Sequence, residues 1–420
     1  MPNWDKAGYR WLWVIPLLTL VFLFNLVGSA PKAWFATFDR GSEALVICSM
    51  IHARSEGPVG LGLGAYGYGA DDWPEGRYQA FSKGEGVTNQ IYDTYKSQFG
   101  LQGHLYDAIY RLTGVRKLKF YHLISSTLLA IVFYLLILAV RAELGVGAAL
   151  GLLLSAICSP WLVGAAKDLY WSPWTWFLPI LTAMIVLGKN KAGDPRWLFA
   201  YFLSLLVRFL CGYEYVSTIL IAAFIPFVYV SVRDRRPLSR FIIEGIRWSV
   251  LSISALITAF LIHAIAYSGN LAQGLALIVK DAKKRTSGLP GVSETMESIN
   301  ASRWHILHRY FFEWRQVGPF SFHVSFTTGI LVFSTCSLYL CQQPERRGKA
   351  LGYSFFFSWL APLSWLILAK QHSFMHPHLI FVLWSVPTLL LGGISFFYVI
   401  ESALPARLPW PNSLLSRWAT

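Results

Sequence analysis

The sequence predicts an all-α, polytopic membrane protein with about ten spanning helices. The chain has 420 residues and a mean hydropathy of +0.46, and only 14% of its residues are charged. An ordinary soluble domain carries about a quarter charged residues. Apolar runs of roughly 18 to 24 residues recur along the chain, as is typical of membrane-spanning helices. The 18 Trp and 20 Tyr fit aromatic belts at the membrane surfaces.

These apolar runs divide a single membrane domain into spans and loops. A first span is expected at 11–30, spans two to seven within 120–267, and spans eight to ten within 322–400. Two long loops, 31–119 and 268–321, and a tail at 401–420 complete the chain. An even number of spans puts both termini on one side, together with Arg233, Arg235, Arg236 and Arg240. By the positive-inside rule that side is cytoplasmic, which places both long loops outside a cell membrane, in our interpretation the bacterial inner membrane.

Charge, cysteine content and glycine pattern exclude several other classes. The net charge of +14 does not indicate nucleic-acid binding, because no Lys/Arg cluster lies in a soluble motif and contact with anionic membrane lipids explains it better. The five cysteines contain no CxxC pair, so neither a disulfide framework nor a zinc site follows. A literal GxGxxG at Gly62, Gly64 and Gly67 has no βαβ unit around it, so we interpret it as a substrate lid or a plain loop.

The first long loop is expected to contain two amphipathic helices at the membrane surface. The first covers 43–54 and the second 98–112. Apolar residues at helical spacing define one face of each, which would lie among the lipid headgroups. These residues are Ala44, Ile47, Met50 and Ile51 in the first helix, and Leu101, Leu105, Ile109 and Leu112 in the second.

Asp39 and Glu43 are the candidate catalytic residues. They lie four positions apart, so they share a face if a helix begins near Asp39. A carboxylate at the membrane surface can act as a general base that takes the proton from an acceptor hydroxyl, while Glu43 or Asp93 orients that acceptor. The alternative is that Asp39 only caps the helix. A divalent cation held by some of these carboxylates is a further alternative, but the oxygen-ligand spacing identifies no metal site.

Basic residues at the outward ends of several spans are candidates for binding a phosphate. Preorganised cations would stabilise the charge that develops on a polyprenyl-phosphate leaving group. Arg208 and Glu214 have a structural alternative as an ion pair, and the Lys370 to His376 segment has one as a membrane-interface anchor. The candidates for substrate binding are Arg116, Lys117, Lys167, Arg208, Glu214, Lys370, His372 and His376.

Three segments resemble the GT-C superfamily of integral-membrane glycosyltransferases, which includes protein O-mannosyltransferases and lipid A aminoarabinose transferases. They are 38–43 (FDRGSE) after the first span, 95–104 (YKSQFGLQGH) before the second, and 370–376 (KQHSFMH) near the end. The resemblance implies an inverting displacement with Asp39 as base, a polyprenyl-phosphate-linked sugar as donor, and a glycan, lipid or protein as acceptor. It also implies substrate contacts for Tyr95 and Gln98. Arg40 follows Asp39 where the mannosyltransferases have an acidic doublet.

Two other functions stay open at this point. A non-enzymatic flippase or transporter of lipid-linked saccharides should carry charged residues in mid-span along a pathway, whereas most candidates here lie at span ends. An O-antigen polymerase or ligase would use basic residues in a late outer loop, where this chain has Arg303, Arg309 and Arg315.

Overall fold

The computed structural model describes residues 9–57, 60–87, 90–188, 194–287, 296–308, 311, 322–376, 379 and 381–403. Arg309 and Arg315 of the second long loop lie outside these residues, and so does the expected tail beyond position 403.

Helices form nearly all the secondary structure in this part of the chain, with one two-stranded sheet beside them. In the first half the elements are α2 (Val14–Phe24), α3 (Lys32–Thr37), α4 (Arg40–Ser55), β1 (Gly64–Tyr66), α5 (Glu75–Lys83), β2 (Tyr92–Thr94), α6 (Leu101–Thr113), α7 (Leu118–Leu144), α8 (Val146–Cys158), α9 (Pro160–Ala166), α10 (Trp174–Gly188) and α11 (Pro195–Cys211). In the second half they are α12 (Val216–Arg233), α13 (Leu238–Ser268), α14 (Leu271–Ser287), α15 (Met296–Asn300), α16 (Arg303–His308), α17 (Phe322–Gln342), α18 (Arg346–Ser358), α19 (Leu360–Leu368), α20 (Lys370–Met375), η2 (Phe381–Ser385) and α22 (Thr388–Ala403).

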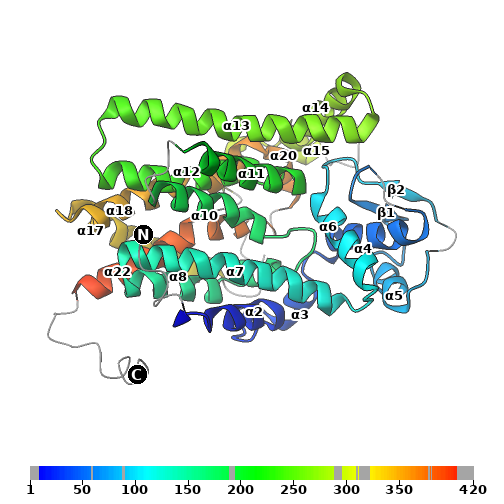
Figure 1. Ribbon diagram of the computed structural model, residues 1–420, viewed down its shortest axis with the longest axis horizontal. Helices are drawn as coiled ribbons and strands as arrows, with labels where there is room; N and C mark the ends of the chain where they lie inside the picture. The colour runs from blue at the N-terminus through cyan, green and yellow to red at the C-terminus, as the bar shows by residue number, and fades with distance from the viewer. Residues whose placement is uncertain are drawn as a thin grey trace.

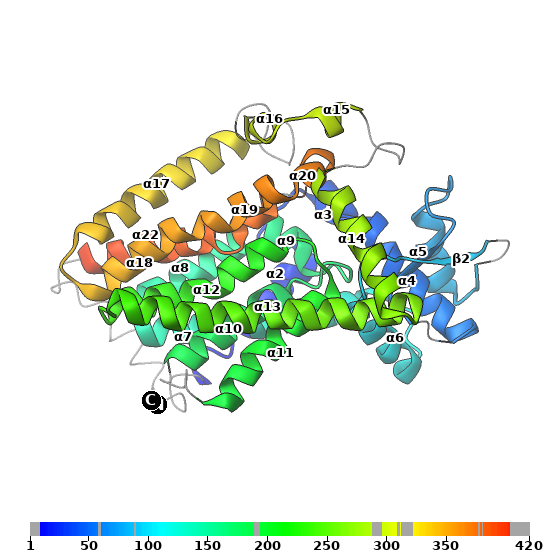
Figure 2. The same cartoon turned by 90° about the horizontal axis from the view of Figure 1, so that it is seen from above.

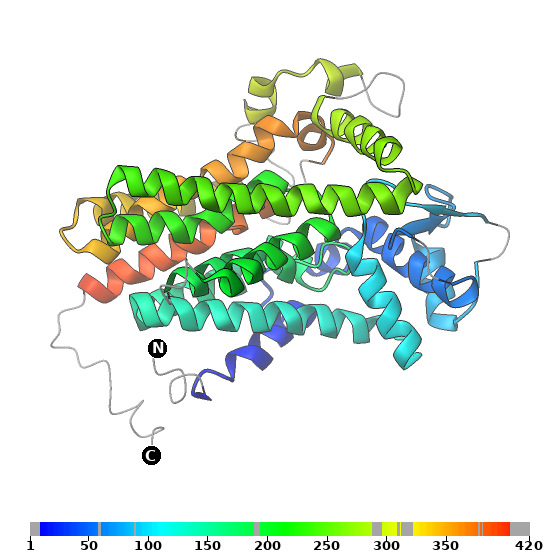
Figure 3. The same ribbon diagram turned by 45° about the horizontal axis from the view of Figure 1, so that its top comes forward.

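The long helices lie alongside one another as a bundle, and α4, α5, α6 and the sheet lie together at one end of it (Figure 1). We call this part, the described residues of 40–113, the cap. The connections from α12 to α13 and from α17 to α18 lie at the opposite end, which we call the far end. Helices α14 to α16 lie above the bundle near α20 (Figures 2 and 3), with which all three are in contact.

The described helices confirm an all-α fold that indicates a membrane protein. Five are long and apolar enough to cross a bilayer, and a sixth results if α8 and α9, bent by 69° at Ser159, are one broken span. Shorter apolar helices lie at Val14–Phe24, Trp174–Gly188 and Thr328–Gln342. Five candidate spans are therefore supported among the described residues, or six with the broken one, and the count of about ten stays a prediction.

Small residues allow the closest packing inside the bundle. Gly151 of α8 lies against the backbone of Gly393 of α22, so closely that a Cβ atom on Gly151 would overlap the Gly393 carbonyl. Membrane helices associate through such small-residue contacts, because lipid offers no hydrophobic drive for them to pair.

The cap differs from the two surface helices expected from the sequence. Helix α4 is present, but every residue from Glu43 to Ala53 is buried, because α5, α6 and β1 pack around it. Helix α6 buries its polar and aromatic face, which includes Gln102, Tyr106 and Tyr110, and leaves Leu112 exposed. The glycine segment contains strand β1, antiparallel to β2 with Gly64 opposite Thr94, so it is not simply a loop.

Candidate active site

Three carboxyl groups from two distant parts of the chain meet where the cap joins the bundle. Asp39 and Glu43 lie at the start of α4, and Asp168 lies in the connection from α9 to α10. The Leu169 amide donates to Glu43 Oε1 (3.1 Å), and the Trp171 indole donates to Asp39 Oδ2 (2.6 Å). These two hydrogen bonds join segments about 130 positions apart, with separations of 126 and 132 residues.

The chain bends between α3 and α4 at Asp39. Its backbone is left-handed (φ 37°, ψ 40°), a region that Asp tolerates better than most residues. Ser172 and Tyr215, both near Trp171 in the same region, also have positive φ, of 40° and 63°. Such backbone conformations cost free energy and occur preferentially at functional sites.

Asp39 is a half-buried residue whose carboxylate is held in one orientation. The Ser42 hydroxyl donates to Oδ1 (2.9 Å), opposite the Trp171 bond to Oδ2. Burial, with a smaller contribution from the charge of Glu43, raises the pKa of Asp39 to about 6, although the two hydrogen bonds act in the opposite direction. Asp39 is thus a carboxylate that can accept a proton near neutral pH.

Glu43 is fully buried and has no free oxygen for a substrate. Tyr78 donates to Oε2 (2.7 Å), while His122 Nε2 (2.8 Å) and the Leu169 amide lie on Oε1. Burial alone would raise the pKa of Glu43, but the charge and hydrogen bond of His122, together with the other donors, outweigh it and lower the pKa. Glu43 is therefore a fixed anion that ties α4 to α5, α7 and the α9–α10 connection.

Asp168 completes the cluster from the bundle side. Its Oδ1 accepts the amides of Tyr170 (2.9 Å) and Trp171 (3.0 Å), which shapes the turn before α10. Its Oδ2 is buried and has no hydrogen-bond partner among the described residues. Burial, followed by the charges of Glu43 and Asp39, raises the pKa of Asp168 well above its ordinary value.

A close contact between α9 and α3 puts Lys167 beside these carboxyl groups. Gly164 lies against Trp34 and Phe38, where a Cβ atom would overlap the Trp34 ring. The Lys167 ammonium then lies 3.7 Å from the centre of the Phe35 ring. Burial lowers the pKa of Lys167, and the charges of Glu43 and Asp168 oppose that shift. Lys167 is the predicted phosphate-binding cation that the fold brings closest to the cluster.

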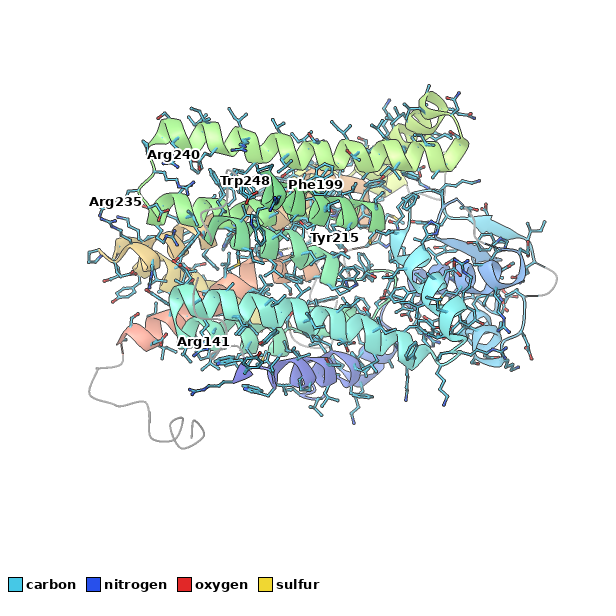
Figure 4. The ribbon with its side chains drawn as sticks, viewed as in Figure 1. Arg141, Phe199, Tyr215, Arg235, Arg240 and Trp248 are labelled. Atoms are coloured by element: carbon cyan, nitrogen blue, oxygen red, sulfur yellow. The ribbon has the colours of Figure 1, made fainter. Side chains whose placement is uncertain are left out.

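Aromatic rings form the bundle side of the site. Trp171 stacks on Tyr215, with ring centres 5.3 Å apart and planes 8° apart. The Tyr215 ring also meets the edge of Trp365 and of His372 (6.1 Å). Figure 4 shows Tyr215 among the bundle helices, on the side toward the cap. His372 therefore contacts Tyr215, which in turn stacks on Trp171 of the site.

A second polar group lies next to Tyr170 and consists of Arg208, Glu214 and Gln98. Arg208 donates to the Glu214 carbonyl oxygen (2.6 Å), which differs from the expected side-chain ion pair, and the Tyr170 hydroxyl donates to Glu214 Oε1 (3.1 Å). Gln98 is buried next to Gly212 and Glu214. These three candidates lie in the wall of the site. None of their described contacts is with a carboxylate of the cluster.

The remaining candidates lie elsewhere. Asp93 is exposed on β2 beside Lys96 (3.7 Å), and the Tyr95 amide donates to the Leu63 carbonyl (2.8 Å). Arg116 donates to the Lys83 carbonyl (3.3 Å) behind α5, and Lys117 is exposed. Lys370 donates to the Ile299 carbonyl (2.6 Å), and His376 is exposed. In the described structure Arg116 and Lys370 thus contact main-chain oxygens of different segments, not one shared phosphate site.

The side chains of the site do not suggest a metal centre. Within the described ranges, no group of three or more His, Cys, Asp or Glu side chains is placed to hold a metal ion. The three carboxyl groups are instead occupied mainly by amide, hydroxyl and ring N–H donors.

Sequence reasoning missed Asp168, Trp171 and Tyr215 as parts of the site. The available signal was the segment 167–171 (KDLYW), in which two charged residues and two aromatic residues directly follow an apolar run. That segment drew attention to Lys167, but its relation to Asp39 depends on how α9 packs against α3.

No protein-family model, curated protein or solved structure matches this chain. The fold and the site therefore define a class only: a helical membrane protein with a cluster of buried carboxyl groups between its bundle and its cap.

Proposed function

We propose that this protein is a membrane glycosyltransferase, with Asp39 as the general base. It moves a sugar from a polyprenyl-phosphate carrier to the hydroxyl of a glycan, lipid or protein acceptor. The observation that carries the proposal is the Asp39 carboxylate, which belongs to a half-buried residue, is oriented by Trp171 and has a pKa of about 6. A general base works best when its pKa lies near the working pH.

The reaction is a single displacement at the anomeric carbon. Asp39 takes the proton of the acceptor hydroxyl while the acceptor oxygen forms a bond to that carbon. The bond between the carbon and the phosphate oxygen breaks, and the electron pair leaves with the polyprenyl phosphate. Because Glu43 is a fixed anion whose oxygens are occupied, it keeps Asp39 basic and does not compete for the proton.

We propose that Lys167 stabilises the departing phosphate, because it lies beside the cluster. Arg40 follows Asp39, but its guanidinium lies 4.1 Å from the centre of the Tyr78 ring and is ion-paired with Glu75. Cations preorganised in a partly dry site stabilise developing charge more strongly than they would in water.

The finer topology belongs to the same proposal. We propose that the three shorter apolar helices and α11 (Pro195–Cys211) also cross the membrane, which brings the six candidate spans to ten, and that the cap lies outside the bacterial inner membrane. The far end, with Arg233 to Arg240, is then cytoplasmic.

The test is release of free polyprenyl phosphate by the purified full-length chain in phospholipid vesicles. The probes are a panel of polyprenyl-phosphate-linked hexoses and amino sugars, and mass spectrometry measures the products. We expect release with at least one donor, and a fall of about 10²-fold or more in Asp39→Asn, since general-base catalysis contributes about 10²–10⁴-fold. Asp194→Asn is the matched control, because Asp194 is also a helix N-cap residue and Asn caps as well as Asp.

A different outcome would replace the proposal. If the vesicles moved the intact donor across the bilayer, equally well in the wild type and in Asp39→Asn, the protein would be a transporter. Equal release by the two proteins would remove Asp39 as the base.

A further inference from the structure

A hollow lies inside the bundle, in the half toward the far end. It has a volume of about 220 Å³ and lies between α7, α8, α10, α12, α18 and α22. Its wall is almost entirely aliphatic and aromatic; Leu136, Ile180, Met184 and Ile225 are typical members. An apolar cavity of about 150 Å³ stays dry and binds a benzene-sized molecule. This larger cavity therefore suits a hydrocarbon and not a polar ligand.

The few polar groups of the cavity lie at one edge. Glu143 accepts hydrogen bonds there from the Tyr229 hydroxyl (3.0 Å) and from Arg233 (2.9 Å). Arg347, at the start of α18, is also near Glu143 (3.7 Å). Arg233 is also bound to Asp234 (2.7 Å), so two arginines and two carboxylates form a balanced group at the edge of the apolar cavity.

Further basic side chains surround this edge. Arg141, Arg235 and Arg240 all lie at the far end in Figure 4, and Arg346 is exposed beside Arg347. Among the described residues at this end, Arg141, Arg233, Arg235, Arg236, Arg240, Arg346 and Arg347 still outnumber the acids Glu143, Asp234, Glu244, Glu345 and Glu401. The surroundings therefore favour an anion at the mouth of the cavity.

The cavity is separate from the carboxyl cluster. Tyr215 of the cluster precedes α12 and Arg233 ends it, so the two sites lie about 27 Å apart along an 18-residue helix. A ligand bound at the cluster does not reach the charged edge, and the two sites face opposite ends of the bundle.

We propose that this cavity binds one hydrocarbon chain of an anionic phospholipid, with the lipid phosphate beside Arg233 and Arg347. Each methylene group transferred into an apolar site gains about 0.8 kcal/mol relative to water, so an unfilled apolar wall of this size favours a chain. The surplus positive charge selects the head group. The lipid comes from the leaflet at the far end, and it is therefore not the substrate carrier of the cap end.

The test is photolabelling of the full-length protein in vesicles that contain trace phosphatidylglycerol with a diazirine at the end of one acyl chain. Peptide mapping after illumination locates the attached lipid. We expect labels on the inner faces of α10 and α12, at residues such as Ile180, Met184 and Ile225. A label confined to outward-facing residues, such as the exposed Ile253 of α13, would overturn the proposal.

Filling the cavity should remove this label. Ala222 lines the cavity, so Ala222→Leu should lower labelling of α10 and α12 at least threefold. Ala272→Leu on the exposed face of α14 is the matched control and should leave it unchanged. Ala222→Val makes the same test with a smaller change if Ala222→Leu does not fold. Unchanged labelling in a folded Ala222 variant would contradict the proposed site.

The head-group assignment has its own measurement. Phosphatidylcholine with the same diazirine chain should label α10 and α12 at least threefold less than phosphatidylglycerol, and Arg347→Gln should remove most of that difference. Equal labelling by the two lipids in the wild-type protein would overturn the assignment of an anionic head group.

Discussion

At Asp39, two neighbours hold a carboxylate in place while its surroundings keep it basic. The Trp171 and Ser42 hydrogen bonds favour the anion, and burial favours the protonated form. The result is a group that titrates near pH 6, inside the range where most cells work. A plain helix-capping Asp in water would titrate near its ordinary value and would have no need of a buried indole.

Asp168 has a different task, which two substitutions can separate. Its Oδ1 accepts two buried amides, and its raised pKa shows that the neutral form fits this site. We expect Asp168→Asn to fold normally, because the Asn carbonyl can accept the same two bonds. Asp168→Leu leaves both amides unpaired and should destabilise the protein by about 2–6 kcal/mol, at ~1–3 kcal/mol for each group. Thermal unfolding in detergent measures both variants, and equal stability would contradict this role.

The residues of the site show what the sequence could and could not predict. Asp39 and Glu43 were identified from their position after an apolar run, and their carboxyl groups do lie in one cluster. The sequence interpretation let Glu43 orient the acceptor, whereas in the structure Tyr78, His122 and Leu169 occupy its oxygens. Asp168 was missed because no local pattern relates a residue to one about 130 positions earlier.

At the scale of elements, the attachment of α4 to its neighbours depends on a buried charge. Glu43 joins α4 to α5, α7 and the α9–α10 connection through its hydrogen bonds. Glu43→Gln replaces an accepting oxygen by an amide nitrogen that cannot accept. We expect a loss of about 1.5–3 kcal/mol in the free energy of unfolding, as for hydrogen bonds to charged groups.

Glu56→Gln is the matched control for this prediction, because Glu56 directly follows the same helix and is exposed. Its effect should stay within about 0.5 kcal/mol, as for ordinary surface substitutions. If both variants unfolded at the same temperature as the wild type, Glu43 would not hold the cap to the bundle.

Helix positions were easier to predict than helix surroundings. The apolar runs gave the places of α7, α12, α13 and α22, because long apolar runs require helices in a bilayer. The apolar face of α4 was assigned to lipid, but it is covered by the cap itself. Periodicity shows which face of a helix is apolar, and it does not show whether lipid or protein covers that face.

The whole molecule has two chemically different ends, and this gives a test of its orientation. The cap end carries the carboxyl cluster, and the far end carries Arg141, Arg235 and Arg240 (Figure 4). We expect an impermeant maleimide to label Ile91→Cys of the cap on intact cells and to label Arg240→Cys only after the membrane is opened. Both variants need a background without the five native cysteines.

Ile91 and Arg240 suit this test because both are exposed, so access to the reagent depends on the membrane and not on burial. If the two cysteines were labelled together on intact cells, the cap and the far end would lie on one side. The proposed topology would then be wrong, even if the carboxyl site were correct.

The pH dependence of sugar transfer tests the role of Asp39 most directly. A general base works only when ionised, so kcat/KM should fall about tenfold per pH unit below pH 6. Trp171→Phe keeps the ring against Tyr215 but removes the indole N–H that lowers the pKa of Asp39. We predict that kcat/KM begins to fall near pH 6 in the wild type, and that this acid limb lies at higher pH in Trp171→Phe. A limb at the same pH in both proteins, or a flat profile from pH 5 to 7, would contradict it.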